Sequence, residues 1–267
     1  MSLAPGTRLA SYEIVALLGS GGMGEVYRAR DVRLRRDVAL KIIARSNNED
    51  AHRRVLSEAR AAAAVSHPNI CQIFEVGEEQ GTLFITMELL TGETLADRIL
   101  RGPLAVSQAI PLAVEALTAL QVIHQQGLIH RDLKPGNIFL TPHGVKILDF
   151  GLAKPVSVAV DSSLTQTATR VTQAGAMMGT PRYMSPEQIQ GRTLDARSDL
   201  FAMGATLYEM LAGTPAFAGN TNVEVLHATL HEAPAALGGS RTIESVNRIL
   251  QRLLAKNPHD RPASASA

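Results

Sequence analysis

The chain carries the stretch His130-Arg131-Asp132-Leu133-Lys134-Pro135-Gly136-Asn137, and the triplet Asp149-Phe150-Gly151 follows shortly after it. Asp132 can accept a proton, and Lys134 can neutralise charge on a phosphate. Asn137 and Asp149 offer the hard oxygen ligands that Mg²⁺ prefers. Any one of these aspartates could be only a helix cap or a turn former. Two acids, an amide and a lysine in this order make that interpretation improbable, and the two motifs together indicate a site that handles phosphate and metal.

A glycine-rich segment near the amino terminus, Gly19-Ser20-Gly21-Gly22-Met23-Gly24, matches the pattern G-x-G-x-x-G. The pattern alone also fits a dinucleotide-binding turn, which joins a strand to a helix. The following residues, Glu25-Val26-Tyr27-Arg28, include β-branched and aromatic side chains and predict a strand. We therefore expect the glycines to join two strands and to lay backbone amides over the phosphates of ATP, which disfavours NAD.

A third predicted strand, at residues 38–43, contains Val38-Ala39-Leu40-Lys41. A lysine at such a place is usually a solvated charge. A functional lysine needs an acidic partner, and Glu58 on the following predicted helix provides one, whereas Glu49 and Asp50 precede that helix in a polar turn. We expect Lys41 and Glu58 to form an ion pair that points the ammonium group at the α- and β-phosphates.

The first ninety residues read as strands with one helix, and the rest reads as helices. Strands are predicted at residues 12–18, 25–30, 38–43, 71–76 and 82–89, and a helix at residues 52–65. Ile110, Val114, Leu117 and Leu120 form an apolar stripe on one long helix. Residues 198–211 predict a buried helix and residues 246–254 an amphipathic one. Two packed units joined near residues 90–92 fit this order better than one continuous sheet.

Composition narrows the class of protein. The 26 basic and 25 acidic residues leave a net charge of +1, so no extended nucleic-acid or membrane surface is expected. Cys71 is the single cysteine and cannot form an internal disulfide. The first twelve residues lack the apolar core of a signal peptide, and no stretch approaches the ~20 apolar residues of a membrane span. We therefore expect a cytoplasmic catalytic domain cut from a longer protein, whose other parts could include a membrane anchor.

A long segment with few apolar runs lies between Asp149 and Glu187 and is rich in serine and threonine. Loops of this length in a compact domain are usually functional or disordered. Its position between two motifs favours a regulatory loop. Thr172 is the first candidate for autophosphorylation, and Thr165, Thr167 and Thr169 come next, although most threonines there individually read as polar loop residues.

Taken in order, these motifs resemble those of protein kinases, specifically the bacterial eukaryotic-like (Hanks-type) serine/threonine protein kinases. The resemblance covers residues 12–262, and Lys134 within Asp-Leu-Lys-Pro-Gly-Asn looks like the serine/threonine version. It implies an α+β, bilobal protein-kinase fold in a single domain over residues 1–267. A small antiparallel β-sheet N-lobe with one main helix would span about residues 12–90, and a larger α-helical C-lobe about residues 91–267.

The resemblance also implies an activity and its partners. It implies transfer of the ATP γ-phosphoryl group to serine and threonine hydroxyls of proteins, with Mg²⁺, or alternatively Mn²⁺, as the metal. A homodimer for activation is a further expectation. Two rivals remain open: a pseudokinase, disfavoured because Lys41, Asp132, Asn137 and Asp149 are all present, and a small-molecule kinase, disfavoured by the intact substrate segment at residues 180–187.

Individual roles follow from the resemblance. Asp132 would be the base, Thr180 would lie near Asp132 and Lys134, and Asn137 and Asp149 would bind the metal. Met87 resembles the residue that guards the back of the adenine pocket, and the backbone of Glu88 and Leu90 would hydrogen-bond adenine. Val26, Ala39 and Phe139 would sandwich the ring. The loop that covers the nucleotide would comprise Leu18, Gly19, Ser20, Gly21, Gly22, Met23, Gly24 and Glu25.

Other positions are either shared with the family or depart from it. Glu187 and Arg261 resemble an ion pair that ties the segment after the loop to the large lobe, and Glu93 would contact ribose or a basic substrate side chain. Phe201 stands where many relatives have tryptophan, and Ser185 replaces a common alanine. Ala62 is small where leucine or methionine often completes an apolar stack, which predicts a loosely held helix around Glu58.

Overall fold

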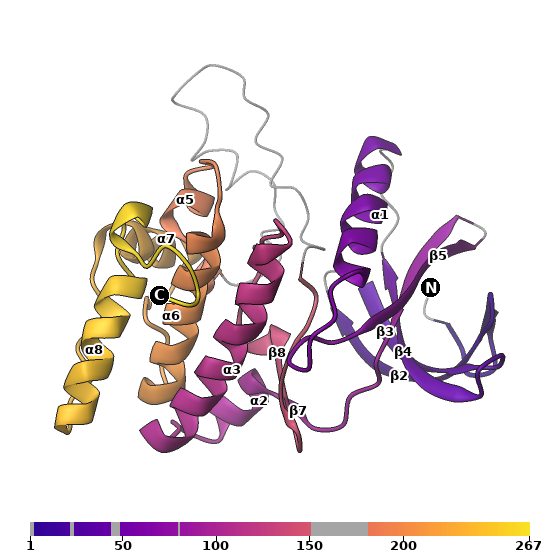
Figure 1. Ribbon diagram of the computed structural model, residues 1–267, viewed down its shortest axis with the longest axis horizontal. Helices are drawn as coiled ribbons and strands as arrows, with labels where there is room; N and C mark the ends of the chain where they lie inside the picture. The colour runs from indigo at the N-terminus through magenta and orange to yellow at the C-terminus, as the bar shows by residue number, and fades with distance from the viewer. Residues whose placement is uncertain (1–2, 22–23, 44–48, 80, 151–180) are drawn as a thin grey trace.

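The computed structural model describes residues 3–21, 24–43, 49–79, 81–150 and 181–267 in two packed lobes (Figure 1). The N-lobe is built on a six-stranded sheet in the order β1-β2-β3-β4-β6-β5, and every neighbouring pair is antiparallel. The strands are β1 (Arg8–Leu9), β2 (Tyr12–Gly21), β3 (Gly24–Asp31), β4 (Arg36–Ile43), β5 (Ile73–Glu79) and β6 (Thr82–Met87). β4 lies inside the sheet and is the strand that carries Lys41.

Helix α1 (Glu49–Ala63) packs against β5 of this sheet. Of the α1 side chains that the structure describes, the buried ones are Ala59 and Ala62, and both are small. Ala62 belongs to the same apolar cluster as Ile73 and Phe150. It is the position where the family often has leucine or methionine. The small contact residues bury little apolar area, so the packing holds α1 less strongly than larger side chains would.

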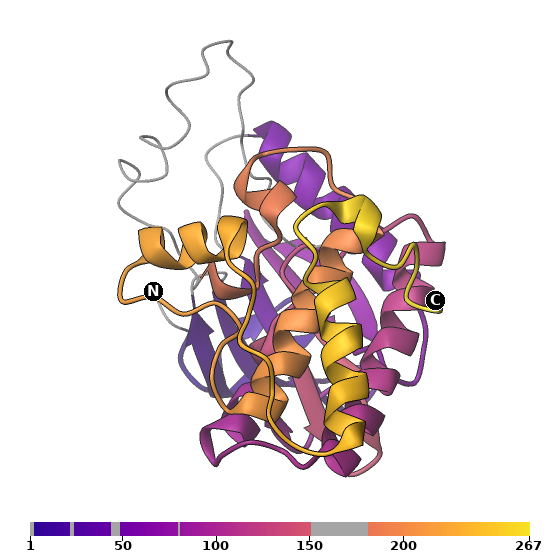
Figure 2. The ribbon, with the colours of Figure 1, turned by 90° about the vertical axis from the view of Figure 1, so that its left-hand side faces the viewer.

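The C-lobe is mainly helical, with a small three-stranded sheet beside the junction of the lobes. Its helices are α2 (Leu95–Leu100), α3 (Val106–Gln125), α5 (Pro186–Ile189), α6 (Ala196–Ala212), α7 (Asn222–His231) and α8 (Arg241–Leu253). The sheet order is β7-β8-β9, from β7 (Glu93–Thr94), β8 (Ile138–Thr141) and β9 (Gly144–Ile147), and three 3₁₀ turns are η1 (Pro135–Asn137), η2 (Pro181–Tyr183) and η3 (Pro258–Asp260). Figure 2 shows α8 lying beside α6.

Helix α6 is the centre of this lobe. Twelve of its residues are buried, and it contacts α3, α8 and η2. Gly204 lets α8 approach closely, because a Cβ there would lie 2.7 Å from Leu253 Cβ. The predicted buried helix at residues 198–211 is therefore confirmed, with bounds extended by one or two residues.

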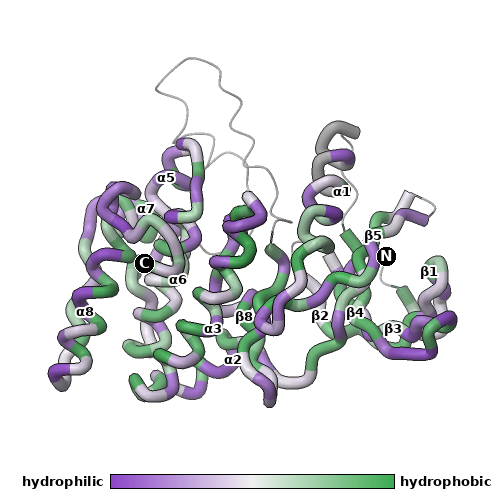
Figure 3. The backbone as a smooth tube through the Cα atoms, viewed as in Figure 1, coloured by the Kyte–Doolittle hydropathy of each residue, from purple (hydrophilic) through white to green (hydrophobic). Residues whose placement is uncertain are grey.

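Helix α3 corrects one expectation from the sequence. It is long and apolar enough to cross a membrane by length and composition, although no such segment was predicted. Hydrophobic and hydrophilic segments alternate along it (Figure 3). The buried residues of α3 include Ala109, Ala113, Ala116 and Leu120, which belong to the main core. The helix packs against α6 and β9. Its contacts are those of a core helix.

Candidate active site

The glycine-rich segment joins β2 to β3, as predicted, and no helix follows it. Gly21 pairs with Gly24 across the hairpin, while Gly22 and Met23 lie outside the described residues. Gly24 has φ +127°, and any Cβ there would collide with the carbonyl oxygen of Ile42. A Cβ at Gly19 or Gly21 would meet open space. The strand–turn–strand context does not fit a dinucleotide-binding turn.

Lys41 is buried in β4, and its Nζ lies 2.7 Å from Asp149 Oδ2. The expected ion pair with Glu58 is not formed in this arrangement. Glu58 Oε1 instead lies 3.4 Å from an Nη of Arg131, and Glu58 Oε2 is buried without a hydrogen-bond partner among the described residues. The acid that neutralises Lys41 is therefore the predicted metal ligand, and the acid of α1 contacts Arg131, the residue before Asp132.

Three predicted side chains converge in the segment that ends in η1. Lys134 Nζ lies 2.6 Å from Asp132 Oδ2, and Asn137 Nδ2 donates to the Asp132 carbonyl at 2.7 Å and to Oδ2 at 3.1 Å. Asp132 and Lys134 are about one-third exposed, so a substrate can reach the carboxylate. Asn137 is buried, and its Nδ2 donates its hydrogen bonds to Asp132. The Oδ1 of Asn137 is therefore left as a ligand for a cation.

The backbone beside these groups is strained at two residues. Arg131 has φ +68° and Asp149 has φ +55°, the left-handed region that side-chain-bearing residues rarely adopt. Such conformations persist only where the surroundings enforce them, and they are concentrated at functional sites. Asp199 enforces the first one, because its buried carboxylate accepts hydrogen bonds from the N–H groups of His130 (2.8 Å) and Arg131 (2.9 Å).

His130 has the internal role that the sequence predicted. The ring is fully buried, and its Nε2 hydrogen-bonds the carbonyl of Leu148 at 3.0 Å. Sequence reasoning did not identify Asp199 as a functional residue. The available signal was an aspartate within a nearly continuous apolar helix, where an acid needs several donors to be tolerated.

The residues expected around adenine lie on adjacent strands. Ala39 pairs with Met87 in the β4–β6 register, and Val26 pairs with Lys41 in the β3–β4 register. Phe139 follows from β8 on the side of the C-lobe. These positions agree with a nucleotide site between the lobes, and each role remains a proposal.

The segment after β6 offers backbone groups for a nucleotide base. The Glu88 N–H is used by the Gln72 carbonyl at 2.9 Å, so only the Glu88 carbonyl is available there, and the Cys71 Sγ lies 3.8 Å from it. Leu90 has no backbone hydrogen bond to any described residue. The Glu88 carboxylate binds Lys146 at 2.7 Å, a contact not predicted. Burial raises the pKa of the Cys71 thiol to about 12, which keeps it unreactive.

The predicted ion pair between Glu187 and Arg261 is confirmed. Two hydrogen bonds of 2.7 and 2.9 Å join the side chains, both of which are buried, and Ser198 Oγ donates to Glu187 at 2.7 Å. Burial alone would raise the pKa of Glu187, but the hydrogen bonds from Arg261 and Ser198 lower it below its usual value. Phe201, in place of the common tryptophan, is fully buried and stacks on Phe217.

Several other predicted residues are engaged elsewhere or lie outside the described residues. Glu93 holds Arg101 through two hydrogen bonds of 2.5 Å, which lower the pKa of the Glu93 carboxyl and leave it paired rather than free. Thr180 lies outside the described residues, as do the candidate phosphorylation sites Thr165, Thr167, Thr169 and Thr172.

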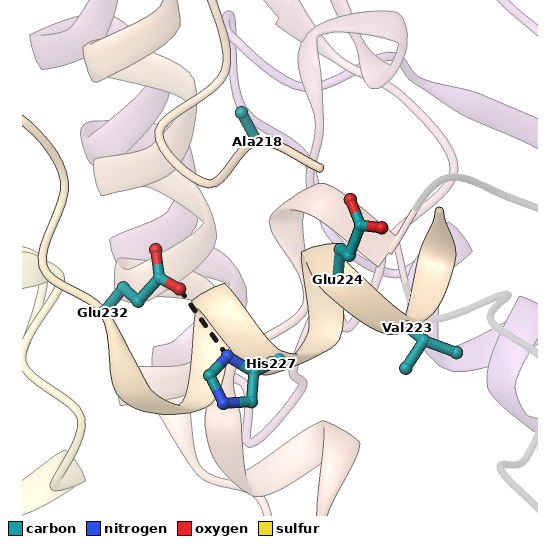
Figure 4. A pocket seen from close by; sticks show the side chains of 5 residues that line it. All are labelled: Ala218, Val223, Glu224, His227 and Glu232. Atoms are coloured by element: carbon teal, nitrogen blue, oxygen red, sulfur yellow. Dashed lines mark ion pairs between the residues drawn. The ribbon is translucent and has the colours of Figure 1, made fainter. Parts of the chain in front are cut away.

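A hollow of ≈ 400 Å³ lies at α7, formed by residues other than the predicted site residues (Figure 4). It is lined by Ala218, Val223, Glu224, His227 and Glu232. The His227 Nδ1 and Glu232 Oε1 atoms are 3.5 Å apart across it, and both side chains are largely exposed. Its chemistry is therefore unrelated to the groups around Asp132.

Comparisons with known proteins agree with this geometry. Residues 12–267 match the family model of the protein kinase domain. The chain is 40% identical to the serine/threonine-protein kinase PknB of Mycolicibacterium smegmatis over 265 residues, which covers 96% of this chain and 41% of that protein. It is also 40% identical to the DNA damage-responsive serine/threonine-protein kinase RqkA of Deinococcus radiodurans, covering 100% of this chain and 40% of that one. The chain thus spans about two-fifths of the length of these relatives.

A solved structure shows the same fold. The Mycobacterium tuberculosis PknI kinase domain superposes with a TM-score of 0.79 at 27% identity, covering 99% of this chain and 95% of that one. The expected bilobal α+β architecture, with an antiparallel N-lobe sheet and a helical C-lobe, is therefore confirmed. The chain belongs to the protein kinase family, among the bacterial serine/threonine kinases.

Proposed function

We propose that this domain transfers the γ-phosphoryl group of ATP to serine and threonine hydroxyls of proteins, and first to threonines of its own loop. The observation that carries the proposal is that Lys134 and Asn137 both contact the Asp132 carboxylate. In addition, Lys41 forms an ion pair with Asp149. Phosphoryl transfer needs little covalent chemistry from a protein, so correctly placed charges supply most of the catalysis.

Each side chain then has a defined task. Asp132 accepts the proton of the attacking hydroxyl, and Lys134 moves from Asp132 towards the γ-phosphate, where it neutralises developing charge. Lys41 orients the α- and β-phosphates, which requires it to leave Asp149. Thr180 would lie near the hydroxyl that reacts, as the family resemblance implies.

The donor set fits a hard divalent cation. Asn137 directs its amide nitrogen at Asp132 and keeps its carbonyl oxygen for a ligand, and Asp149 supplies a carboxylate. Mg²⁺ commonly uses one or two such protein oxygens together with substrate phosphates. Asn137 and Asp149 would hold the ion, whose positive charge would offset that of the phosphates.

We infer a resting arrangement from these ion pairs. Family kinases need the lysine–glutamate pair in place for turnover, whereas Lys41 binds Asp149 and Glu58 contacts Arg131. A phosphate on Thr172, Thr165, Thr167 or Thr169 would attract Arg131, and Glu58 would then be released to pair with Lys41. Loop phosphorylation would thereby raise activity.

Intact mass measurement after incubation with ATP and Mg²⁺, followed by phosphosite mapping, tests the proposal. The wild-type chain is expected to gain phosphates on Thr172 or its neighbours, and Asp132→Asn and Asp149→Asn are expected to gain none while remaining folded. No added mass in the wild type, despite demonstrated ATP binding, would overturn the proposal in favour of a pseudokinase.

The order of the autophosphorylation reaction tests the expected homodimer. If one chain phosphorylates another, the specific rate rises with protein concentration, whereas a reaction within one chain has a constant specific rate.

A peptide substrate compared with small-molecule hydroxyls distinguishes a protein kinase from a small-molecule kinase, and only the peptide is expected to react.

A further inference from the structure

Two histidines lie about one helical turn apart at the carboxyl end of α7. His227 and His231 are separated by four positions, so their side chains lie on the same face of the helix. Their ring centres are 4.8 Å apart, and the ring planes are tilted by 49°. Both residues are exposed, so an ion in solution can reach both rings. Two histidines at this spacing on one helix face are a known arrangement for binding Zn²⁺.

Glu232 determines which nitrogen of His227 is left for a ligand. His227 Nδ1 lies 3.5 Å from Glu232 Oε1, and the other ring nitrogen points away from this carboxylate (Figure 4). Histidines that bind metals commonly turn their second nitrogen to a carboxylate, which fixes the ring and makes it a more basic ligand. Nε2 of His227 is therefore the nitrogen that is available to an ion.

The separation of the two rings fits a shared ion. A Zn²⁺ ion lies about 2.0–2.1 Å from each imidazole nitrogen that it binds, so two rings on one ion must lie close together. Ring centres 4.8 Å apart meet this requirement. His231 forms no hydrogen bond or ion pair with any described residue, so it would lose no such partner on binding an ion.

The charge beside the two rings favours a cation. The hollow at His227 is lined by five residues, which include Glu224 and Glu232 but no lysine or arginine. Glu224 already accepts a backbone hydrogen bond at 2.7 Å, whereas Glu232 contacts His227 and its side chain is 62% exposed. Imidazole nitrogens suit Zn²⁺, Ni²⁺ and Cu²⁺, while Mg²⁺ prefers oxygen ligands. The ion that fits here is therefore of a different class from the one expected at the phosphate site.

We propose that His227 and His231 together bind a divalent transition-metal ion of the Zn²⁺, Ni²⁺ and Cu²⁺ class, and that Glu232 positions the His227 ring. Water would complete the coordination of the ion. Such an ion would link two successive turns at the end of α7. Binding does not depend on phosphoryl transfer, so the proposal can be tested whether or not the chain is an active kinase.

Calorimetric titration of the tag-free chain with ZnCl₂, in excess Mg²⁺ to saturate oxygen sites, tests the proposal. The wild type is expected to bind one Zn²⁺ ion per chain. Glu232→Ala should weaken binding by about tenfold, the lower end of the range for such carboxylates, because Glu232 is exposed. His227→Gln and His231→Gln should each weaken it by more than that, since each removes a ligand. The matched control is His143→Gln, the same change at an exposed histidine between β8 and β9, which should bind as the wild type does.

Three outcomes would overturn the proposal. The first is a wild-type chain that binds no Zn²⁺. The second is an unchanged affinity in both His227→Gln and His231→Gln, which would place the ion elsewhere on the chain. The third is a loss of affinity in only one of these two variants, because that result belongs to a single exposed imidazole and not to a shared ion.

Nitrogen-15 NMR of the histidine side chains gives a second readout. Zn²⁺ should shift the Nε2 resonance of His227 together with one nitrogen of His231. A shift at Nδ1 of His227 instead would refute the positioning role of Glu232. An inactive chain that binds Zn²⁺ as expected would refute only the proposed function, and an active chain that binds none would refute only this site.

Discussion

Among single residues, Glu187 and Arg261 form the ion pair whose loss should lower the free energy of unfolding most. Both side chains are buried and joined by two hydrogen bonds. Removing one partner from a buried ion pair leaves an uncompensated charge and typically costs about 3–5 kcal/mol. Arg261→Met should therefore lower the free energy of unfolding by that order, measured by urea denaturation.

The double variant Glu187→Gln/Arg261→Met provides the control for this prediction. Because neither side chain is then charged, it should be more stable than Arg261→Met alone. A single variant as stable as the wild type would show that the pair contributes little to folding.

The Lys41–Asp149 contact is a second residue-scale feature with a measurable consequence. Asp149→Asn should remove the carboxylate that neutralises buried Lys41 and should also weaken metal binding. Saturating ATP with Mg²⁺ at about 100 times Kd should stabilise the wild type by about 2.7 kcal/mol. In Asp149→Asn the Mg²⁺-dependent part of the shift in Tm should disappear while ATP alone still stabilises. An equal Mg²⁺-dependent shift in both chains would exclude Asp149 as a metal ligand.

At the scale of elements, the α6–α8 contact depends on the missing side chain of Gly204. An alanine in a helix interior is favoured over glycine by about 1 kcal/mol, but overpacking a tight core costs about 1–3 kcal/mol. The added Cβ would lie 2.7 Å from Leu253 Cβ, so the steric cost should prevail. Gly204→Ala should therefore lower Tm, measured by thermal unfolding of the wild type and the variant. A raised Tm in Gly204→Ala would show that α8 moves away freely.

The carboxyl end of α7 is held by Lys256, which makes this contact depend on pH. The Lys256 Nζ donates to the Thr229 carbonyl at 2.7 Å and lies 4.0 Å from the ring centre of Phe217. Burial, and secondarily the charge of Arg261, lower the pKa of Lys256 from 10.5 to about 8. Between these two values the unfolded chain binds more protons than the folded one, so this group makes stability rise with pH there.

Comparison with Lys256→Met isolates this contribution. The stability of the wild type relative to the variant should increase from pH 8 to pH 10 and stay constant below pH 7, measured by thermal unfolding of both chains. The difference removes the contributions of other groups that titrate in the same range, Cys71 among them. A difference that falls with rising pH would contradict the lowered pKa.

The elements also show what the sequence could predict and what it could not. Long periodic segments and alternating strands were predicted within a few residues, because burial of one face imposes the pattern. The strands β1, β7, β8 and β9, of two to four residues, and the short helices α2 and α5 were missed, because such lengths carry too little pattern. Helix α7, of ten residues, was missed as well. The motif residues around Asp132 converged as expected, since they lie within a few residues of each other.

Contacts between distant segments set the limit of prediction. The acid that pairs with Lys41 depends on how α1 is turned on the sheet, and no local pattern distinguishes Glu58 from Asp149. His124 and Asp199 are 75 residues apart, and their hydrogen bond follows from the packing of α3 on α6. Two polar residues within apolar helices were a signal, but only the fold shows that they meet.

For the molecule as a whole, the chain passes once from the N-lobe to the C-lobe, after β6, and ion pairs also join the two lobes. Glu58 of the N-lobe contacts Arg131 of the C-lobe, and Lys41 contacts Asp149 across the same junction. Glu58→Gln should therefore weaken the resting contact and also prevent the productive one. We expect kcat of the phosphorylated enzyme to fall by at least about tenfold with little change in ATP affinity, because the loss affects charge placement in the transition state. Steady-state kinetics on phosphorylated wild type and variant measure this, and equal kcat values would exclude a role for Glu58 in turnover.

The apolar character of α3 has a consequence for the synthesis of the protein rather than for its chemistry. As the chain leaves the ribosome, α3 emerges before α6 and α8, the helices that later enclose it. During that interval a hydrophobic segment of membrane-spanning length is exposed, and such segments attract aggregation and chaperones. Polar substitutions on the buried alanines would ease synthesis but would weaken the core. The apolar side chains of these twenty residues thus stabilise the folded protein but expose the growing chain to aggregation.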